Sequence, residues 1–419
     1  MECRPSVILK NVAVPGGRVT DIMITEGVVS HAGAGTSADT VIDCTALFVL
    51  PAAIDMHVHM RGGLQSAKED WESGSKSALA GGVTFVVDQP NTVPPITTPD
   101  ALRARVLEAK SRSLCHFAIN SGVTHDTPLR AMWSAGAMAF GEVFFAPSSY
   151  GDAVSRQELR TALGELKALG ALATIHAEEV TPGPDTTLST HRQLRSPEGE
   201  VRAVREVLKA NTAGCRLHFC HMSTGPSVDT AHGSIEVTPH HLFLSQETFR
   251  GDETFGKVNP PLRSEKERRE LFSRWQQIDV IASDHAPHTR PEKQQLFSVA
   301  PSGLPGVETM MPLLLAAVLR KKVSLPEVIQ KTSSNPAAIL GIQPAGFTPG
   351  CRGDFALYPK RSVPIDASLL HSRCGWTPFE GHEGVFPSRV IMDGVVVYEE
   401  GEFFCANPAW IPGKGYFPP

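Results

Sequence analysis

The sequence predicts an α/β fold: a (β/α)8 TIM barrel that carries a small β-sandwich domain built from both ends of the chain. Three observations support this prediction. The middle of the 419-residue chain alternates apolar strand-like runs with helical patterns, and both ends consist of short strands broken by turns. No glycine-rich phosphate-binding turn follows the first strand of the middle region, which argues against an open doubly wound sheet. The predicted parts are 1–50 and 350–419 for the small domain and 51–349 for the barrel.

The first fifty residues predict four short strands, at 6–11, 18–25, 27–31 and 40–43. Glycines at 16, 17, 33 and 35 mark the turns between them. The tail has the same character, with strands predicted at 354–358, 388–392 and 395–399. An Asp-Gly pair at 393–394 separates the last two, as in a tight hairpin. We therefore expect the two ends of the chain to pair into one small sheet domain.

The middle of the chain contains eight strand-like runs, at 52–59, 83–88, 115–120, 138–145, 171–176, 216–221, 234–237 and 279–283. Helical patterns lie between most of them, at 68–80, 100–110, 156–169, 198–211 and 265–276. Eight strands with mostly helical crossovers are typical of a (β/α)8 barrel. In that fold the functional residues gather at the carboxyl ends of the strands.

Composition excludes several classes of protein. Hydrophobic residues make up 41% and charged residues 20%, and 39 basic against 44 acidic residues leave a net charge of −5. These values argue against disorder, collagen and coiled coil, and the mild acidity argues against nucleic-acid or anionic-membrane partners. The first residues lack an apolar signal region, and the most apolar window, 310–319, is about half the length that spans a bilayer. The eight scattered cysteines show no C-x-x-C pair, so we predict reduced thiols and a cytoplasmic protein.

Polar residues fall where a barrel keeps its function. The first run ends in His-Val-His, and residues two apart on a strand share a face. A lone strand histidine is more often a hydrogen-bonded core residue than a ligand. A joint pattern of four histidines and two carboxylates at five strand ends instead predicts a metal site. The residues are His57, His59, Glu142, His176, His221 and Asp284.

Imidazole and carboxylate ligands without thiolate suit Zn²⁺, with Mn²⁺ or Co²⁺ as substitutes. Six ligands exceed the needs of one tetrahedral ion and fit two ions that share a bridge, although a single ion per subunit stays open. A pair of ions lowers the pKa of a water molecule and polarises a carbonyl group. The residues therefore predict a metal-dependent hydrolase.

Eight short blocks carry a family resemblance: HVHMR at 57–61, KED at 68–70, GGVT at 81–84, PNT at 90–92, VTPHH at 237–241, NPPLR at 259–263, DHAPH at 284–288 and GLPGVET at 303–309. Together they resemble the amidohydrolase superfamily and, within it, the dihydroorotase family. The flanking β segments are also similar to the small composite domain of that family. The resemblance implies a zinc-dependent barrel that interconverts dihydroorotate and N-carbamoyl-aspartate in pyrimidine synthesis.

The resemblance also implies roles for individual residues. One ion would be held by His57, His59 and Asp284 and the second by His176 and His221, with Asp284 also acting as the catalytic proton shuttle. The substrate would be bound by His59, Arg61, Asn91, Asn259 and His288 and by backbone at Ser302 and Gly303. An Arg two residues past a metal-binding His can grip a carboxylate in bidentate fashion, which suits an anionic small-molecule substrate.

The sequence departs from the family pattern on the fourth strand. Many relatives bridge their metals there with a carboxylated lysine, but this chain has Glu142 and no lysine between Lys110 and Lys167. Glutamate supplies the negative charge on a shorter arm, so the number of metals stays open. The neighbouring loop at 147–152 is not clearly matched, and we assign it no role beyond that of a lid.

Other functions remain in competition. A related cyclic amidase, of the allantoinase or hydantoinase type, is one alternative. Four residues favour an anionic substrate and argue against it: Arg61, Asn91, Asn259 and His288. A non-catalytic scaffold that supports a transcarbamoylase is another, and the complete ligand set speaks against that. Arg61 could also form a salt bridge at the rim, and Asn91 could be a turn residue. The sequence leaves homo-oligomers and association with a transcarbamoylase open.

Overall fold

The computed structural model describes residues 6–31, 37–144, 154–249, 251, 253–405 and 407–418. Eight parallel strands form two sheets, one of β6 to β8 and one of β9 to β13. Single bridges between Ser121 and Phe140 and between Val58 and His285 join the two sheets, so that the barrel closes. All eight predicted strand runs are confirmed. The strands are β6 (Ala53–Val58), β7 (Val83–Asp88), β8 (His116–Ile119), β9 (Phe140–Phe144), β10 (Leu172–His176), β11 (Arg216–Phe219), β12 (Ser234–Val237) and β13 (Val280–Ile281).

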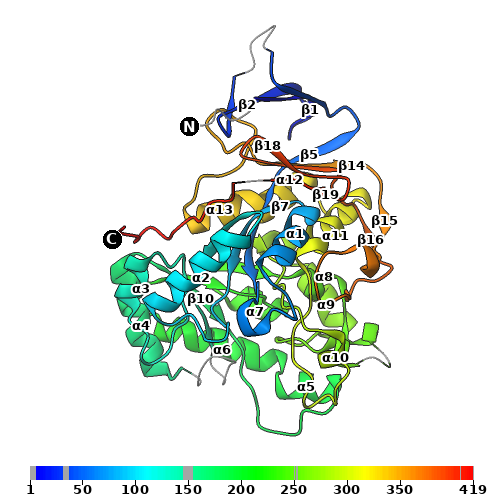
Figure 1. Ribbon diagram of the computed structural model, residues 1–419. Coiled ribbons are helices and arrows are strands. Elements are labelled where there is room, and N and C mark those ends of the chain that lie inside the picture. The colour runs from blue at the N-terminus through cyan, green and yellow to red at the C-terminus, as the bar shows by residue number, and fades with distance from the viewer. Residues whose placement is uncertain are drawn as a thin grey trace.

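Helices surround the barrel (Figure 1). The predicted helices are present, and their ends follow from local capping. Asp70 caps the first helix, which therefore starts at Trp71 and not at the predicted residue 68. The prediction at 265–276 divides into a helix and a short 3₁₀ turn (Trp275–Gln277). The helices are α1 (Trp71–Gly81), α2 (Pro99–Arg112), α3 (Leu129–Ala135), α4 (Arg156–Leu169), α5 (Leu188–Leu194), α6 (Pro197–Ala210), α7 (Gly225–Thr230), α8 (Pro239–Phe243), α9 (Glu265–Phe272), α10 (Arg290–Lys293), α11 (Val307–Leu319), α12 (Leu325–Ile329) and α13 (Asn335–Leu340).

Two sheets above the barrel in Figure 1 form the small domain, and both ends of the chain contribute. Strand β5 pairs antiparallel with β14, although about 300 residues separate them. The sheets share a buried apolar core that includes Leu9, Ile24 and Phe355. One sheet contains β1 (Val7–Ala13), β2 (Val19–Thr25), β3 (Val28–Ser30) and β4 (Thr40–Asp43); the other contains β5 (Leu47–Pro51), β14 (Phe355–Pro359), β17 (Arg389–Met392), β18 (Val395–Glu399) and β19 (Glu402–Phe403). The domain boundaries at 50 and 350 stay predictions.

Apolar side chains fill part of the barrel. Ile54 and Met56 of β6 belong to one buried cluster with Phe85 and Val87 of β7 and with Leu340 of α13. Both strand pairs obey the two-residue repeat of a pleated strand, which places their members on one face. Because apolar side chains fill this part of the barrel, the polar side chains lie at the carboxyl ends of the strands.

The end of the chain returns to the barrel, where Figure 1 shows the C-terminus near α3. The Phe117 backbone of β8 donates to the Ala409 carbonyl at 3.1 Å and accepts from the Ile411 amide at 2.9 Å. Within the described residues, no helix is long and apolar enough to cross a membrane. The seven cysteines that the structure describes are all free thiols, as the sequence predicts.

Candidate metal centre and active site

The structure brings the six predicted ligands together at the carboxyl ends of five strands. His57 and His176 lie on β6 and β10, and Glu142 lies on β9. The other three follow strands: His59 comes directly after β6, and His221 and Asp284 come shortly after β11 and β13. All six side chains are buried. Residues 147–152, to which the sequence assigned a lid, lie outside the described residues.

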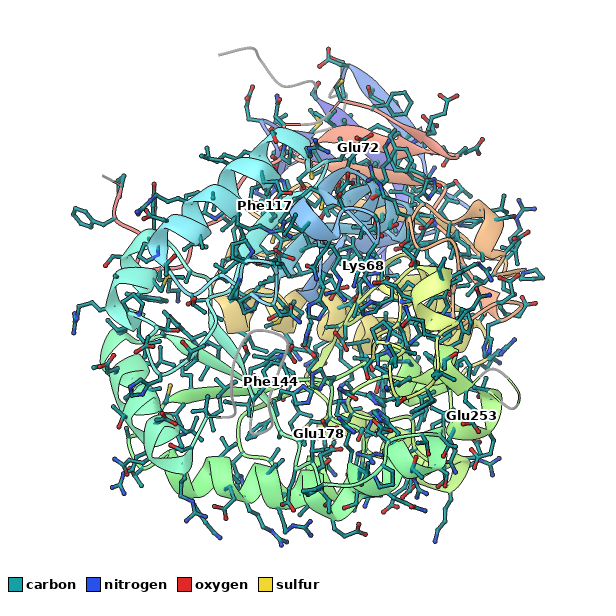
Figure 2. All side chains as sticks on the ribbon, turned by 60° about the horizontal axis from the view of Figure 1, so that its bottom comes forward. Lys68, Glu72, Phe117, Phe144, Glu178 and Glu253 are labelled. Atoms are coloured by element: carbon teal, nitrogen blue, oxygen red, sulfur yellow. The ribbon has the colours of Figure 1, made fainter. Side chains whose placement is uncertain are left out.

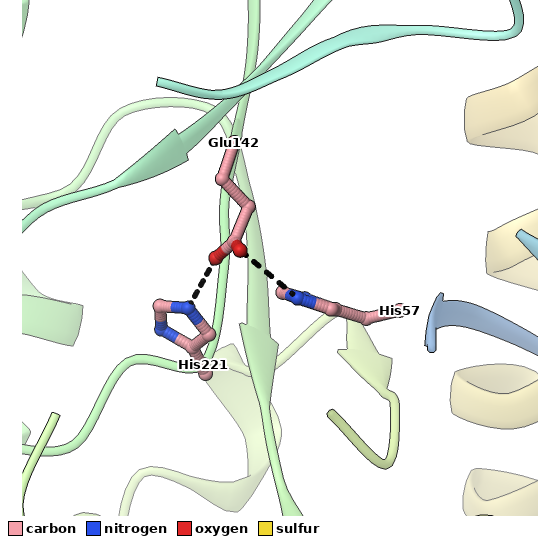
Figure 3. Close-up of side chains that lie close together, drawn as sticks. All are labelled: His57, Glu142 and His221. Atoms are coloured by element: carbon pink, nitrogen blue, oxygen red, sulfur yellow. Dashed lines mark hydrogen bonds and ion pairs between the residues drawn. The ribbon is translucent and has the colours of Figure 1, made fainter. Parts of the chain in front are cut away.

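Glu142 lies at the centre of this group. Its Oε1 is 2.6 Å from His221 Nε2, and its Oε2 is 3.5 Å from His57 Nε2 (Figure 3). The same Oε1 is 3.4 Å from His176 Nδ1. Asp284 Oδ1 is 3.0 Å from His59 Nε2 and 3.5 Å from His57 Nε2. Two sets of three predicted ligands share His57, and in each set the atoms that could bind a metal lie within 4.8 Å of one another. The sets are His57, Glu142 and His221, and His57, His59 and Asp284.

The chemistry of the group fits divalent cations. His57 Nε2 is buried and has no hydrogen-bond partner among the described residues, although carboxylates of Glu142 and Asp284 face it. Burial disfavours an imidazolium here, yet the charges of Glu142 and Glu236 raise the pKa of His57 well above its usual value. Two buried carboxylates thus attract positive charge into a set of imidazoles, as a site for a metal such as zinc requires.

Each of three predicted histidine ligands has its second ring nitrogen held by an acceptor. Glu236 Oε1 lies 3.0 Å from His57 Nδ1. Asn91 Oδ1 lies 2.6 Å from His59 Nδ1, and Glu178 Oε2 lies 3.3 Å from His176 Nε2. Such contacts fix the tautomer and the ring orientation of metal-binding histidines.

Glu236 and Glu178 are the functional residues that the sequence analysis missed. Glu236 also accepts from the backbone N–H of His221 at 3.0 Å and lies 3.0 Å from His218 Nε2. It stands inside the short run of β12, where a single acid gives no sign of a partner. The available signal was chemical, because a buried histidine ligand needs an acceptor for its other nitrogen.

Three site residues have unusual backbone conformations. Arg61, His221 and Asp284 have φ angles of 49°, 34° and 46°, in the left-handed region that residues other than glycine rarely adopt. Each of them follows a barrel strand at its carboxyl end. Strain of this kind persists where the surrounding structure holds a side chain in place, and it concentrates at functional sites.

A cavity of about 430 Å³ opens beside the ligand group. All of the predicted substrate contacts line it, whereas His57 is fully buried and is not part of the lining. Lys68, Phe144 and Glu178, to which the sequence analysis gave no role, also line the cavity and are labelled in Figure 2. The predicted contacts are His59, Arg61, Asn91, Asn259, His288, Ser302 and Gly303.

Several lining residues have buried polar atoms without hydrogen-bond partners among the described residues, and Arg61 Nε and Asn259 Oδ1 are two of these atoms. Burial lowers the pKa of Arg61 to about 10, so its guanidinium is charged at neutral pH. A buried cation and an unpaired amide oxygen beside a cavity can bind an anionic ligand that also offers an N–H group.

The neighbours of His288 determine its protonation. Its Nε2 lies 3.1 Å from the Ser302 carbonyl, which only accepts, and its Nδ1 lies 3.3 Å from the Lys68 ammonium, which only donates. The ring is therefore neutral with its proton on Nε2. Burial, together with the charges of Arg61 and Lys68, lowers the pKa of His288 to about 3.

Known proteins of one family are similar to this chain over most of its length. Residues 48–397 match the model of the amidohydrolase family. A dihydroorotase of Methanosarcina acetivorans is 38% identical over 99% of this chain and 95% of its own length, and one of Halobacterium salinarum is 39% identical over 94% and 96%. Among solved structures, an L-hydantoinase (dihydropyrimidinase) of Arthrobacter aurescens has a TM-score of 0.88 at 26% identity, covering 98% of this chain and all of its own. With a barrel whose strand ends present this ligand group and with a family match over most of its length, the chain belongs to the amidohydrolase family.

Proposed function

We propose that this protein is a dihydroorotase, which reversibly hydrolyses the cyclic amide of (S)-dihydroorotate to N-carbamoyl-L-aspartate in pyrimidine synthesis. One observation carries the proposal: the buried Arg61 lies in the cavity beside the ligand group, with Nε unpaired and Nη2 3.3 Å from His288 Nε2. Since the Nε proton has no acceptor among the described residues, the guanidinium can donate to one anionic group in the cavity. Dihydroorotate carries such a carboxylate, and the archaeal relatives bear the name of the enzyme that acts on it.

We propose zinc as the metal, with two ions per subunit. His57, His59 and Asp284 would hold one ion, His176 and His221 the other, and Glu142 would lie between them, in keeping with its distances to His57 and His221. When bound, such a pair activates water and polarises the amide carbonyl.

The remaining roles belong to the residues of the chain. Arg61 and His288 would bind the carboxylate, and the amides of Asn91 and Asn259 would bind the ring amide edges together with the backbone at Ser302 and Gly303. The Asp284 carboxylate would accept a proton from the attacking water. It would then deliver that proton to the departing ring nitrogen. Its position on the cavity lining gives that carboxylate access to the substrate.

Replacing the shuttle tests this mechanism. Asp284→Asn should lower kcat by about 10²–10⁴-fold, the usual contribution of a general acid–base group. Turnover and metal content are measured on the same preparation. Near-normal turnover with full metal content would show that Asp284 does not move the proton.

The hydantoinase type is the second candidate, because a solved L-hydantoinase has the same fold over the whole chain. Assays with dihydroorotate, hydantoin and allantoin separate the two. Hydantoin and allantoin lack the carboxylate, so Arg61→Gln should reduce turnover of dihydroorotate only. No turnover of dihydroorotate by the wild type would exclude the proposed function.

We keep as proposals a cytoplasmic location and assembly into a homo-oligomer or with a transcarbamoylase. The free thiols support the location, and the family resemblance supports the assemblies. Light scattering on the protein alone and mixed with a transcarbamoylase would test both assemblies.

A further inference from the structure

A buried lysine outside the metal centre holds part of the cavity wall. Lys293, at the end of α10, is fully buried, and its ammonium donates to three backbone carbonyls. The distances are 3.0 Å to Lys257, 3.0 Å to Pro301 and 3.2 Å to Gly303. An ammonium has three N–H donors, so each donor has one acceptor. Burial, together with the charge of Lys257, lowers the pKa of Lys293 to about 7, and the three carbonyl acceptors favour the ammonium form.

The three carbonyls belong to segments that line the cavity. Lys257 precedes the lining residues Val258 and Asn259, and Pro301 and Gly303 are themselves part of the lining. The Gly303 amide also donates to the Lys257 carbonyl at 3.0 Å. The ammonium therefore sits where two chain segments, 44 residues apart at Lys257 and Pro301, meet behind one wall of the cavity.

The third part of the same wall is His288, which directly precedes the turn into α10. A capping box between Thr289 and Glu292 fixes that turn. The Trp376 indole donates to the His288 carbonyl at 2.7 Å, and its ring lies 5.7 Å from the Lys293 ammonium. Lys293 is thereby held on the same rigid turn as His288.

The loop at Gly303 is packed closely against Ala286 and His288, so it has little room to move. Gly303 has a φ of 142°, and a Cβ atom there would lie 2.6 Å from the Ala286 carbonyl and 3.0 Å from His288 Cδ2. A shift of this loop would consequently move the Ser302 carbonyl, which accepts from His288.

We propose that Lys293 is a positioning residue for the substrate: its ammonium fixes the backbone of 257–259 and 301–303 against His288, so that the groups that contact the substrate share one geometry. The inference rests on the proposed function for its substrate and on the carbonyl contacts for its mechanism. Lys293 itself does not line the cavity.

Lys293→Met tests the proposal, because methionine keeps the length of the side chain and removes the donors. We expect KM for dihydroorotate to rise at least about tenfold and kcat/KM to fall by about 10²-fold, the cost of a misplaced binding group, with metal content unchanged. Amide hydrogen exchange should become faster in peptides that cover 254–260 and 297–305.

The matched control is Lys331→Met. Lys331 is also buried, donates to a backbone carbonyl, that of Ile278, and lies 5.2 Å from the Trp275 ring. Ile278 precedes β13, so this lysine stands at the amino-terminal end of the barrel strands. The control loses the same kind of contact and should keep the wild-type KM and the wild-type exchange of the two peptides.

Equal effects of the two lysine variants on stability, with no change in KM or in local exchange, would overturn the proposal. If Lys293→Met does not fold, Gly303→Ala displaces the same loop without removing a charge, and an unchanged KM in that variant overturns the proposal as well. A wild type that does not turn over dihydroorotate refutes the proposed function alone, and hydrogen exchange then decides the role of Lys293.

Discussion

At the scale of single residues, His288 shows how burial and neighbouring charges keep an imidazole neutral. A pKa of about 3 in the folded chain, against an ordinary value of 6.5, means that the unfolded chain binds the proton first as the pH falls. His288 therefore costs stability as the pH drops from about 6.5 towards 3, and its cost is absent above 6.5. Between pH 7 and pH 5 this amounts to about 2 kcal/mol.

Urea unfolding at pH 7, 6 and 5 measures this effect. The free energy of unfolding of His288→Gln should fall less than that of the wild type over this range, because the variant has no imidazole to protonate there. Parallel pH dependences of the two proteins would contradict a neutral, buried His288. Imidazole ¹⁵N spectra should also show a neutral ring with its proton on Nε2 at pH 6.

Glu236 leads to a second prediction at this scale. Glu236→Gln keeps the shape of the side chain and weakens the acceptor for His57 Nδ1, 3.0 Å away. Loss of such an outer contact lowers metal affinity by about 10–100-fold. Competition with a chelator measures that affinity. Glu308→Gln is the matched control, since Glu308 is buried and pairs with His371 at 2.7 Å, and neither residue belongs to the ligand group.

Residue patterns predicted which side chains lie together at the strand ends, but not the acceptors that contact them. His57 and His59 were predictable because a strand repeats every two residues and a barrel presents its strand ends on one side. Lys293 was not, because a lysine in a short polar stretch is usually exposed. Only the fold shows that the Lys293 ammonium contacts the backbone of the loop at 301–303.

At the scale of elements, the local signals that end a helix or strand decided which boundaries were predictable. Helix α4 was predicted to the residue, since Ser155 and Glu158 form a capping box and Gly170 adopts the left-handed conformation that ends it. Strand β5 was missed because only Ala52 separates it from β6, and two strands without a turn between them look like one apolar run. The change of sheet at that point depends on pairing with β14, which a local pattern cannot reveal.

The C-terminal segment offers a prediction about packing between elements. Gly413 donates its amide to the Gly136 carbonyl at 3.0 Å, and a Cβ atom at 413 would overlap the Ala137 carbonyl. Gly413→Ala should therefore destabilise the protein by about 1–3 kcal/mol through overpacking, with a lower Tm in thermal unfolding.

Gly164→Ala is the control for that prediction. Gly164 lies inside α4, and no described atom lies within 4 Å of an added Cβ. Alanine in a helix interior is favoured over glycine by about 0.5–1 kcal/mol, so this variant should have a raised Tm. A Tm for Gly413→Ala at or above that of the wild type would show that the segment does not pack tightly against the barrel.

At the scale of the whole molecule, the ligand group joins strands from opposite parts of the barrel. Glu142 comes from β9, and the side chains that it contacts come from β6, β10 and the end of β11. A metal bound at the proposed ligands would therefore link segments that are far apart in the sequence. By mass action, a ligand that binds only the folded state stabilises it by about 4 kcal/mol at 1,000 times its Kd. Chelation should accordingly lower the Tm and abolish turnover, and zinc should restore both.

Titration of the metal-free protein with zinc tests whether two ions share Glu142. With two ions sharing Glu142, the wild type should reach its end point at two equivalents, and both turnover and Tm should rise until then.

Glu142→Ala should bind one equivalent tightly at His57, His59 and Asp284, because that set does not include the missing carboxylate. Its Tm gain should be smaller, since β9 is no longer tied to β6. One equivalent in the wild type would instead mean that Glu142 serves a single ion, and two tight equivalents in Glu142→Ala would show that it is not the bridge.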